Sequence, residues 1–385
     1  MALLQSFLEK NESISEIICL SLTIAFSIES FLIALKDTHF LRNTELKAIL
    51  FYLRNLNLLP EVVLKECYVD AVLRGEAECN LYEFYQWRIG KIKADNVRGL
   101  CYKKNGEVII NPLPPLVELS QLGYHPFELL DIKKYVDKPV VKRKNYIPGK
   151  ILPFMTSKGC VKKCAFCYNT VVNNSKWRPY SLTSVYREMD FLIENYGITG
   201  WMFYDDNIFV DPERAWTIIE KYKMPSSVEL DLNRVNEKMV ERALKANVAK
   251  LYIGIESGSD RMLKRMHKGI TVKQVREKMQ MCHNMGMNVD LSFMILLPNE
   301  SPEDLEATLS LTRELEEYSN IKIDGPKCYN PYPGTEFFQE VVASGWIIPK
   351  SNEEWAKYNR KISADEAGFN ISQKHIDVLK RYDVI

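Results

Sequence analysis

The sequence predicts an α/β fold whose main domain is a partial (β/α)6 barrel over residues 151–345. In this region, apolar segments of strand length alternate with amphipathic segments of helical period. The expected strands are 151–155, 200–204, 228–232, 250–255, 289–295 and 321–328, and the expected helices are 183–195, 212–221, 237–245, 272–285 and 302–317. Successive βα units imply a parallel sheet, because each crossover helix returns the chain to the same edge. Six such units favour a partial barrel over a closed eight-stranded one.

The region before the barrel shows a different pattern. Over residues 1–110, short apolar runs at 17–22, 48–52 and 71–74 alternate with helix-like stretches at 28–41 and 60–66, which suggests a small α/β unit. Residues 111–150 contain six prolines and many charges, and we expect a linker there. The last segment, 346–385, carries Trp346, Trp355 and Tyr358 and is expected to pack against the barrel.

Composition excludes several classes of protein. The chain has 385 residues, of which 46% are hydrophobic, so it can bury a large core. Its 51 Lys and Arg balance 50 Asp and Glu, which gives no overall electrostatic reason to bind nucleic acid or an anionic membrane. Charged and polar residues interrupt the longest apolar stretch, 14–35, and the start lacks the features of a secretory signal. We therefore expect a cytoplasmic protein without a membrane span.

The strongest motif is CxxxCxxC, formed by Cys160, Cys164 and Cys167 directly after the first expected barrel strand. The chain has nine cysteines, an odd number that favours ligand or core roles over a disulfide framework. Three thiolates can hold three irons of a [4Fe–4S] cube, which leaves the fourth iron for the amino and carboxylate groups of a small molecule such as S-adenosylmethionine (SAM).

Other interpretations of the three cysteines remain open. A structural zinc site needs four close Cys or His ligands, and the nearest others, Cys101, Cys282, His125 and His267, lie far along the chain. A ferredoxin-type electron carrier needs a fourth local cysteine, which the motif lacks. The three thiols could also be buried structural groups.

The motif, with Phe166 before its last cysteine, resembles the defining motif of the radical SAM superfamily. The resemblance covers about 200 residues. It implies a [4Fe–4S] cluster on the loop after the first strand, with SAM lying across the carboxyl ends of the strands. It also implies reductive cleavage of SAM to a 5′-deoxyadenosyl radical for hydrogen abstraction, rearrangement or methylation of an unknown small-molecule substrate. The reductant would be an external flavodoxin, ferredoxin or chemical donor.

The same resemblance implies SAM contacts at the ends of the second and third strands. Tyr204, Asp205 and Asp206 match a segment that contacts the amino group of SAM, a role suited to a carboxylate near an ammonium. A helix cap or a solvated turn is the alternative for either aspartate. Arg234, close to Asp231, could neutralise the SAM carboxylate, although a surface ion pair would explain it equally well.

Further contacts are implied at the later strands. Glu256 and Ser257 belong to a segment that resembles the family's GxESGS and would face SAM, and the glycine that follows would allow close backbone approach. Lys268 matches a position where relatives place a base against the SAM carboxylate; an exposed helix-end lysine is the alternative. Ser292 is the polar residue expected nearest the ribose. Relatives usually have glycine at Leu296, so the pocket is expected to differ there.

Two segments resemble the cobalamin-binding branch of the superfamily. Residues 59–78 are similar to its PEEVL…D.VVRGEGE segment, and residues 331–335 match PYPGT. Residues 1–110 would then be an incomplete, Rossmann-like cobalamin-binding domain, because relatives carry further βα units before it. Residues 51–55 also lack the usual Gly-Gly pair. Cobalamin is therefore left as an alternative cofactor. A vestigial or partner-completed domain, or a cluster-binding paralogue without activity, is the competing interpretation.

Overall fold

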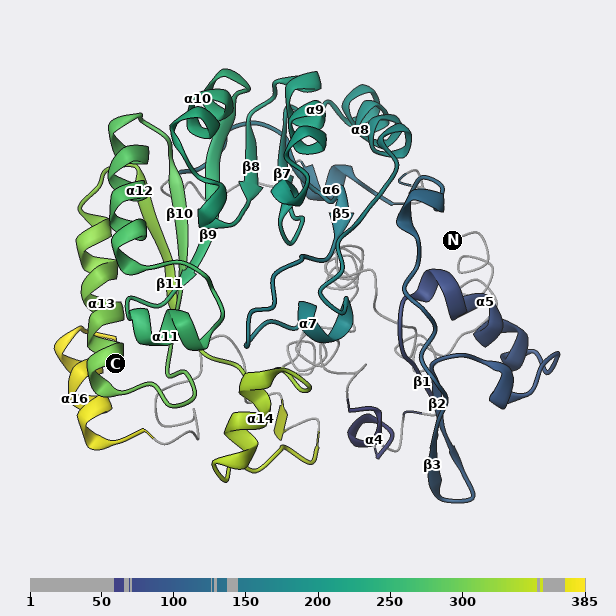
Figure 1. Cartoon of the computed structure of the whole chain (residues 1–385). Helices are drawn as coiled ribbons and strands as arrows, with labels where there is room; N and C mark the ends of the chain where they lie inside the picture. The colour runs from purple at the N-terminus through teal and green to yellow at the C-terminus, as the bar shows by residue number, and fades with distance from the viewer. Residues whose placement is uncertain are drawn as a thin grey trace. The chain divides into compact units, whose positions relative to one another are not determined.

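The computed structural model describes residues 59–65, 69, 71–125, 127, 130–136, 145–351, 354–355 and 371–384. The strands and helix expected at 17–22, 28–41 and 48–52 lie outside these residues. The chain divides into two compact units (Figure 1). The first comprises residues 1–117, 332–334 and 342–359, and the second comprises 118–331, 335–341 and 360–385. The predicted boundaries at 110, 150 and 345 stay predictions.

A six-stranded parallel sheet forms the second unit. Its strands are β4 (Ile151–Phe154), β7 (Gly200–Phe203), β8 (Ser226–Glu229), β9 (Val248–Glu256), β10 (Val289–Ile295) and β11 (Ile321–Cys328). Each strand pairs in parallel with the next along the chain, in the order β11-β10-β9-β8-β7-β4. In the described residues, β4 and β11 do not pair with each other, so the sheet is an open half barrel. The predicted fold class is confirmed.

Five helices lie around the outside of this curved sheet (Figure 1): α8 (Leu182–Tyr196), α9 (Pro212–Tyr222), α10 (Glu237–Lys245), α12 (Val272–Asn284) and α13 (Pro302–Glu316). Each lies within one residue of its predicted bounds. Local chemistry explains the starts, because Ser181, Asp211, Asn236, Thr271 and Ser301 each accept a hydrogen bond from an amide of the first turn. All five helices are therefore defined by local signals.

Alternation along the strands separates the two faces of the sheet. In β9, Leu251, Ile253 and Ile255 are fully buried, whereas Tyr252 and Gly254 between them are only partly buried. The period of two places the first set against the helices and the second on the inner face. The inner face of the half barrel is therefore the accessible one, and side chains there can meet a ligand.

Several short elements were not predicted. β5 (Ser157–Lys158) pairs antiparallel with β6 (Arg178–Pro179), and between them lies α7 (Asn169–Val172). Other short helices are α6 (Lys133–Val136), α11 (Asp260–Arg265), α14 (Glu336–Ala343) and α16 (Gln373–Arg381), with 3-10 turns η4 (Leu119–Gln121), η6 (Ile208–Val210) and η7 (Leu232–Arg234). The end of the chain packs on the barrel unit, because α16 contacts α13 and pairs Arg381 with Glu306.

The described part of the first unit is a small antiparallel sheet with one long helix. It contains α4 (Pro60–Val63), β1 (Ala71–Leu73), α5 (Ala77–Arg88), η3 (Ala94–Asn96), β2 (Leu100–Lys104) and β3 (Glu107–Ile110). Strands β2 and β3 form a hairpin whose turn residues, Asn105 and Gly106, have φ values of 53° and 86°, as a tight primed turn requires. The helix expected at 60–66 and the strand at 71–74 are present but shorter. The Rossmann-like domain over 1–110 stays a prediction, since about half of it is not described.

Within the described ranges, no helix combines the length and the apolar character needed to cross a bilayer.

Candidate functional site

The three cysteines lie on the loop that follows β5, at the carboxyl end of the first barrel strand. Asn169, which is almost fully buried, holds this loop from both sides. Its side-chain oxygen accepts the amide of Cys160 at 3.0 Å, and its side-chain nitrogen donates to the Cys160 carbonyl at 2.7 Å. Gly159 precedes the loop with a φ of 87°, and an added Cβ would lie 2.0 Å from the Lys176 carbonyl oxygen. The start of the loop therefore requires glycine.

Electrostatics show that the three thiols are neighbours. Burial raises the pKa of Cys160 and Cys164, and it raises the pKa of Cys167 to about 12. Charge on Cys160 or Cys164 raises the pKa of Cys167 further, whereas the Lys268 cation lowers the pKa of Cys164. Burial therefore favours the protonated form of all three thiols.

Among the described residues, no three His, Cys, Asp or Glu side chains converge at the distances that a single metal ion requires. A structural zinc site needs four close tetrahedral ligands, and the loop carries three cysteines. The set of three, without a fourth thiol on the loop, fits a cluster with one iron open to another ligand.

Asp205 lies beneath the cysteine loop and is fully buried. It accepts hydrogen bonds from the Thr156 hydroxyl at 2.7 Å, the Ser157 hydroxyl at 2.5 Å and the Thr156 amide. Arg214, from α9, donates to the Thr156 hydroxyl and carbonyl at 3.1 Å and to the Tyr180 carbonyl at 2.8 Å. Burial raises the pKa of Asp205, and the hydroxyls and the Arg214 cation act against that shift. Asp205 therefore supports the loop, and the SAM contact expected of it stays a prediction.

Asp206, the next residue, is placed differently. One of its oxygens accepts the Gly159 amide at 2.7 Å, and the other lies 3.4 Å from the Tyr168 hydroxyl. The side chain reaches solvent, yet desolvation raises its pKa. Tyr204 is exposed beside it. Both residues follow β7, whose carboxyl end lies at the cysteine loop.

Glu256 and Lys268 form an enclosed ion pair next to the loop. Their charged atoms are 3.6 Å apart, and the Lys268 ammonium lies 5.9 Å from the centre of the Phe166 ring. Glu256 ends β9 with a φ of 77°, and its carboxylate folds back over Gly254, where a Cβ would lie 2.1 Å from it. The sequence-predicted residues Phe166, Glu256 and Lys268 are thus brought together with Cys164.

Ser257 lies apart from this group. Its side chain is fully buried, and its hydroxyl lies 3.1 Å from the Thr308 hydroxyl of α13. The Gly258 amide also donates a hydrogen bond to the Thr308 hydroxyl. A Cβ added at Gly258 would lie 2.4 Å from the Ala307 carbonyl oxygen. Both residues therefore pack the strand end against α13, and the expected contact of Ser257 with SAM stays a prediction.

Arg234 is exposed in η7, and no described residue forms an ion pair with its guanidinium. Its neighbour Asp231 instead forms an ion pair with Lys162 of the cysteine loop, at 2.7 Å. Asp231 is therefore in an ion pair, but with Lys162 and not with Arg234. Asp231 also caps η7 by accepting the Asn233 amide. Arg234 therefore stays a candidate without a described contact.

A polar layer on the inner face of the sheet was missed by the sequence reasoning. The Tyr252 hydroxyl donates to Asp324 at 2.7 Å, and Lys327 reaches the same oxygen at 2.6 Å. Ser292, on the strand between them, interacts with Tyr252, and Glu229 is in register with Tyr252 on the other side. The signal was present, since these polar residues alternate with buried apolar ones along their strands. Ser292 thus lies on the inner face of the sheet, and its expected place beside the ribose stays a prediction.

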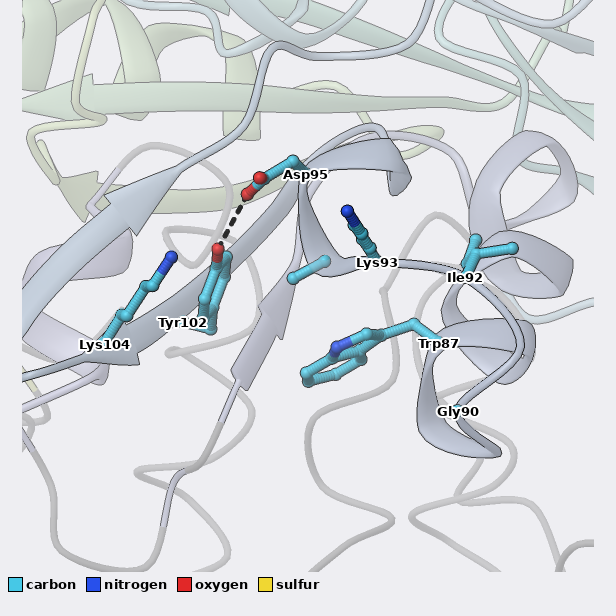
Figure 2. Close-up of a pocket in the computed structure, with 8 residues that line it drawn as sticks. Trp87, Gly90, Ile92, Lys93, Asp95, Tyr102 and Lys104 are labelled. Carbon is cyan, nitrogen blue, oxygen red and sulfur yellow. Dashed lines mark hydrogen bonds between the residues drawn. The ribbon is translucent and has the colours of Figure 1, made fainter.

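A shallow pocket in the first unit is built from other residues. Its walls include Trp87 and Tyr102, and the Tyr102 hydroxyl donates to Asp95 at 3.0 Å (Figure 2). Lys93 and Lys104 lie at its edge. None of its lining residues is a cysteine or belongs to the barrel unit. We assign the chemistry to the barrel, where the thiols and the buried charges gather.

The barrel unit is an open parallel half barrel with three thiols on the loop after its first strand and buried charges at the strand ends. This combination is typical of α/β-barrel enzymes that work with a three-cysteine iron–sulfur centre. Residues 154–312 match the family model of the radical SAM superfamily. This part of the chain is therefore a radical SAM domain, and the resemblance inferred from the CxxxCxxC motif is confirmed.

Relatives support the same class. The chain is 29% identical over 307 residues to an uncharacterized methyltransferase of Pyrococcus horikoshii, an alignment covering 78% of this chain and 63% of the relative. It is 23% identical to cytidylyl-2-hydroxyethylphosphonate methyltransferase of Streptomyces wedmorensis, with 76% of this chain and 60% of the relative covered. The chain thus spans about three fifths of the length of these relatives.

Solved structures show the same fold. The radical SAM methyltransferase TsrM from Kitasatospora setae, with cobalamin and a [4Fe–4S] cluster bound, superposes with a TM-score of 0.57 at 15% identity. That superposition covers 79% of this chain and 63% of TsrM. The cobalamin-dependent enzyme OxsB superposes with a TM-score of 0.53 at 17% identity and covers 86% of this chain and 48% of its own. At this identity, the likeness establishes the fold.

Proposed function

We propose that this chain holds a [4Fe–4S] cluster through Cys160, Cys164 and Cys167 and uses it to cleave SAM reductively. The observation that carries the proposal is the grouping of three half-buried thiols, without a fourth on the loop, at the carboxyl end of a radical SAM half barrel. When bound, such a cluster supplies an electron that breaks a carbon–sulfur bond of SAM and releases a 5′-deoxyadenosyl radical.

The residues around the thiols would bind and orient SAM. Lys268 is the enclosed cation beside Cys164 and would bind the SAM carboxylate, with Glu256 holding it in place. Asp206 and Tyr204 line the neighbouring strand end and would bind the SAM ammonium. Phe166 covers Lys268 and keeps water from it. Ser292 would lie toward the ribose. Arg234, exposed in η7, would contact SAM only from the solvent side of the site.

The outcome of the reaction is proposed in broader terms. Polar side chains on the inner face would contact a small-molecule substrate, from which the radical abstracts hydrogen. An external flavodoxin, ferredoxin or chemical donor would supply the electron. Since the chain spans only part of its relatives' length, the substrate and the partners of the whole protein are proposals of the same kind.

Methyl transfer is the second candidate. Two similar proteins are named methyltransferases, and TsrM and OxsB carry cobalamin. Residues 51–55, expected beside a corrin, lie outside the described part of the chain, so no step is assigned to cobalamin here. A chain that binds hydroxocobalamin and passes a deuterated methyl group from labelled SAM to a product would support this outcome.

The first experiment is anaerobic reconstitution with iron and sulfide, followed by dithionite and SAM. We expect about four irons per chain, as a single cube requires, and production of 5′-deoxyadenosine. Cys164→Ala should abolish both. Cys79→Ala is the matched control, because it removes a free thiol of the first unit and should leave both unchanged. Tetrahedral zinc in the oxygen-free protein, or a cluster whose spectrum SAM never perturbs, would refute the proposal.

A further inference from the structure

Three carboxylates on the inner face of the half barrel are each matched by a lysine. Asp324 pairs with Lys327 at 2.6 Å, and Glu256 pairs with Lys268 at 3.6 Å. Deeper in the barrel, Asp290 pairs with Lys250 at 2.6 Å. Each of these acids therefore has its countercharge within the protein, and its charge is not available to attract a ligand.

Glu229, at the end of β8, has no such partner in the part of the chain that the structure describes. Among the described residues, no hydrogen bond or ion pair reaches its carboxylate. It ends β8, where Val228 before it is fully buried toward the helices, so alternation directs Glu229 to the inner face. Its register partner Tyr252 lies on the same face. Glu229 therefore presents an unmatched negative charge to the ligand side of the sheet.

The charged neighbours of Glu229 are the strand-end residues that lie near the cysteine loop. Burial raises the pKa of Glu229 to about 7, with further contributions from Asp206, Asp205 and Glu256, while Lys327 lowers it. Asp206 and Glu256 are themselves close enough to shift the thiols, Asp206 acting on Cys160 and Cys167, and Glu256 on Cys164. Glu229 ends β8, which lies between β7, followed by Asp205 and Asp206, and β9, which ends at Glu256.

SAM held through its amino acid group beside the thiols would lie along the carboxyl ends of the strands, where Glu229 ends β8, and its sulfonium is only a few bonds from that group. This placement rests on the function proposed above. We propose that Glu229 is the residue that recognises the positive charge of the sulfonium, so that the site selects SAM over its neutral thioether, S-adenosylhomocysteine. An unscreened charge on a recessed wall attracts a cation more strongly than one in bulk water.

The test measures binding rather than turnover. Equilibrium dialysis of anaerobically reconstituted protein would give the affinities for SAM and for S-adenosylhomocysteine, which share the amino acid and adenosine groups and differ by one methyl and one charge. Glu229→Gln keeps the shape and removes the charge. We expect its affinity for SAM to fall about tenfold, equivalent to about 1.4 kcal/mol, while its affinity for S-adenosylhomocysteine changes by less than about twofold.

Two further variants sharpen the result. Glu229→Asp keeps the charge and should retain most of the preference for SAM. Glu316→Gln makes the same chemical change at an exposed position on α13 and should leave both affinities unchanged. Equal loss of both ligands in Glu229→Gln, or no change in either, would overturn the inference and leave the proposed function intact. Wild-type protein that binds no SAM would overturn both.

A pH series on the wild-type protein tests the inference without a variant. Glu229 should ionise as the pH rises through about 7, so the preference for SAM should grow between pH 6 and pH 8. The groups that face Glu229 are Asp205, Asp206, Glu256, Tyr252 and Lys327. A preference that stays flat over this range in the wild type would contradict a role for the Glu229 charge.

Discussion

The Lys268 ammonium lies 3.6 Å from a carboxylate oxygen of Glu256, and the barrel encloses both side chains. Burial alone would favour the neutral forms, raising the pKa of Glu256 and lowering that of Lys268. The negative groups around Lys268, Glu256 first among them, outweigh this effect and raise the pKa of Lys268. A stable cation is thereby kept beside Cys164, where an anionic ligand would have to bind.

Removing one partner of this pair should cost more than removing both. Lys268→Met leaves the Glu256 carboxylate enclosed without a countercharge, and we expect the free energy of unfolding to fall by about 3 kcal/mol. The double variant Lys268→Met/Glu256→Gln should recover most of that loss. Urea denaturation of the cofactor-free protein would measure the coupling. Additive effects of the two single changes would show that the pair is not energetically linked.

Arg214 should be needed for the cysteine loop to hold iron. Arg214→Lys keeps the charge, but a single ammonium cannot bind both oxygens of Thr156 and the Tyr180 carbonyl in the same way. We expect stability to fall by about 1–2 kcal/mol, and reconstituted iron to be lost faster on gel filtration.

The matched control for Arg214 is Arg276→Lys, because Arg276 pairs with Glu314 on the exposed surface. It should change stability by less than about 0.5 kcal/mol and leave iron retention unchanged. If both variants retain iron as the wild type does, Arg214 has no part in supporting the loop.

Gly159 offers a steric test of the same loop. In Gly159→Ala the new Cβ would lie 2.0 Å from the Lys176 carbonyl oxygen, so the loop has to move. Iron binding should be lost or strongly reduced. Gly197→Ala also places alanine at a positive φ, of 67°, but nothing lies within 4 Å of its Cβ, so its cost should be about 1 kcal/mol with normal iron binding. Equal iron binding in the two variants would contradict the geometry of the loop.

Glu300 should give the cofactor-free protein a pH-dependent stability. Burial raises the pKa of Glu300 from 4.5 to about 8. A carboxyl group whose pKa is raised on folding stabilises the protein fully below its unfolded pKa, and this contribution is lost as the pH rises through the folded value. Stability should therefore fall between about pH 5 and pH 8, by at most about 1.4 kcal/mol per pH unit for this group.

Glu300→Gln keeps an oxygen that can accept the Leu296 amide, which Glu300 binds at 2.6 Å, and removes the titration. Denaturant titrations at several pH values should show a smaller slope in this variant than in the wild type. Identical slopes would mean that Glu300 is ionised in the folded protein at neutral pH.

The sequence by itself determined the barrel. Each of its strands and long helices carries its own period, and caps such as Ser181 and Thr271 are local, so the elements could be placed to within a few residues. The cysteine motif is likewise contiguous, and its spacing alone pointed to a three-thiolate cluster. Residues at the strand ends could be predicted as site candidates because the carboxyl ends of parallel strands lie at one edge of the sheet.

The tertiary structure decided which strand-end residues remain free to bind a ligand. Asp205 and Asp206 are adjacent in the sequence, yet one is buried under Thr156 and the other faces the recess. The Ser257 hydroxyl contacts α13. Glu229 is a strand-end acid that forms no ion pair with any described residue. These outcomes depend on partners tens of residues away, which set the burial and the hydrogen bonds of each side chain, and no local pattern records them.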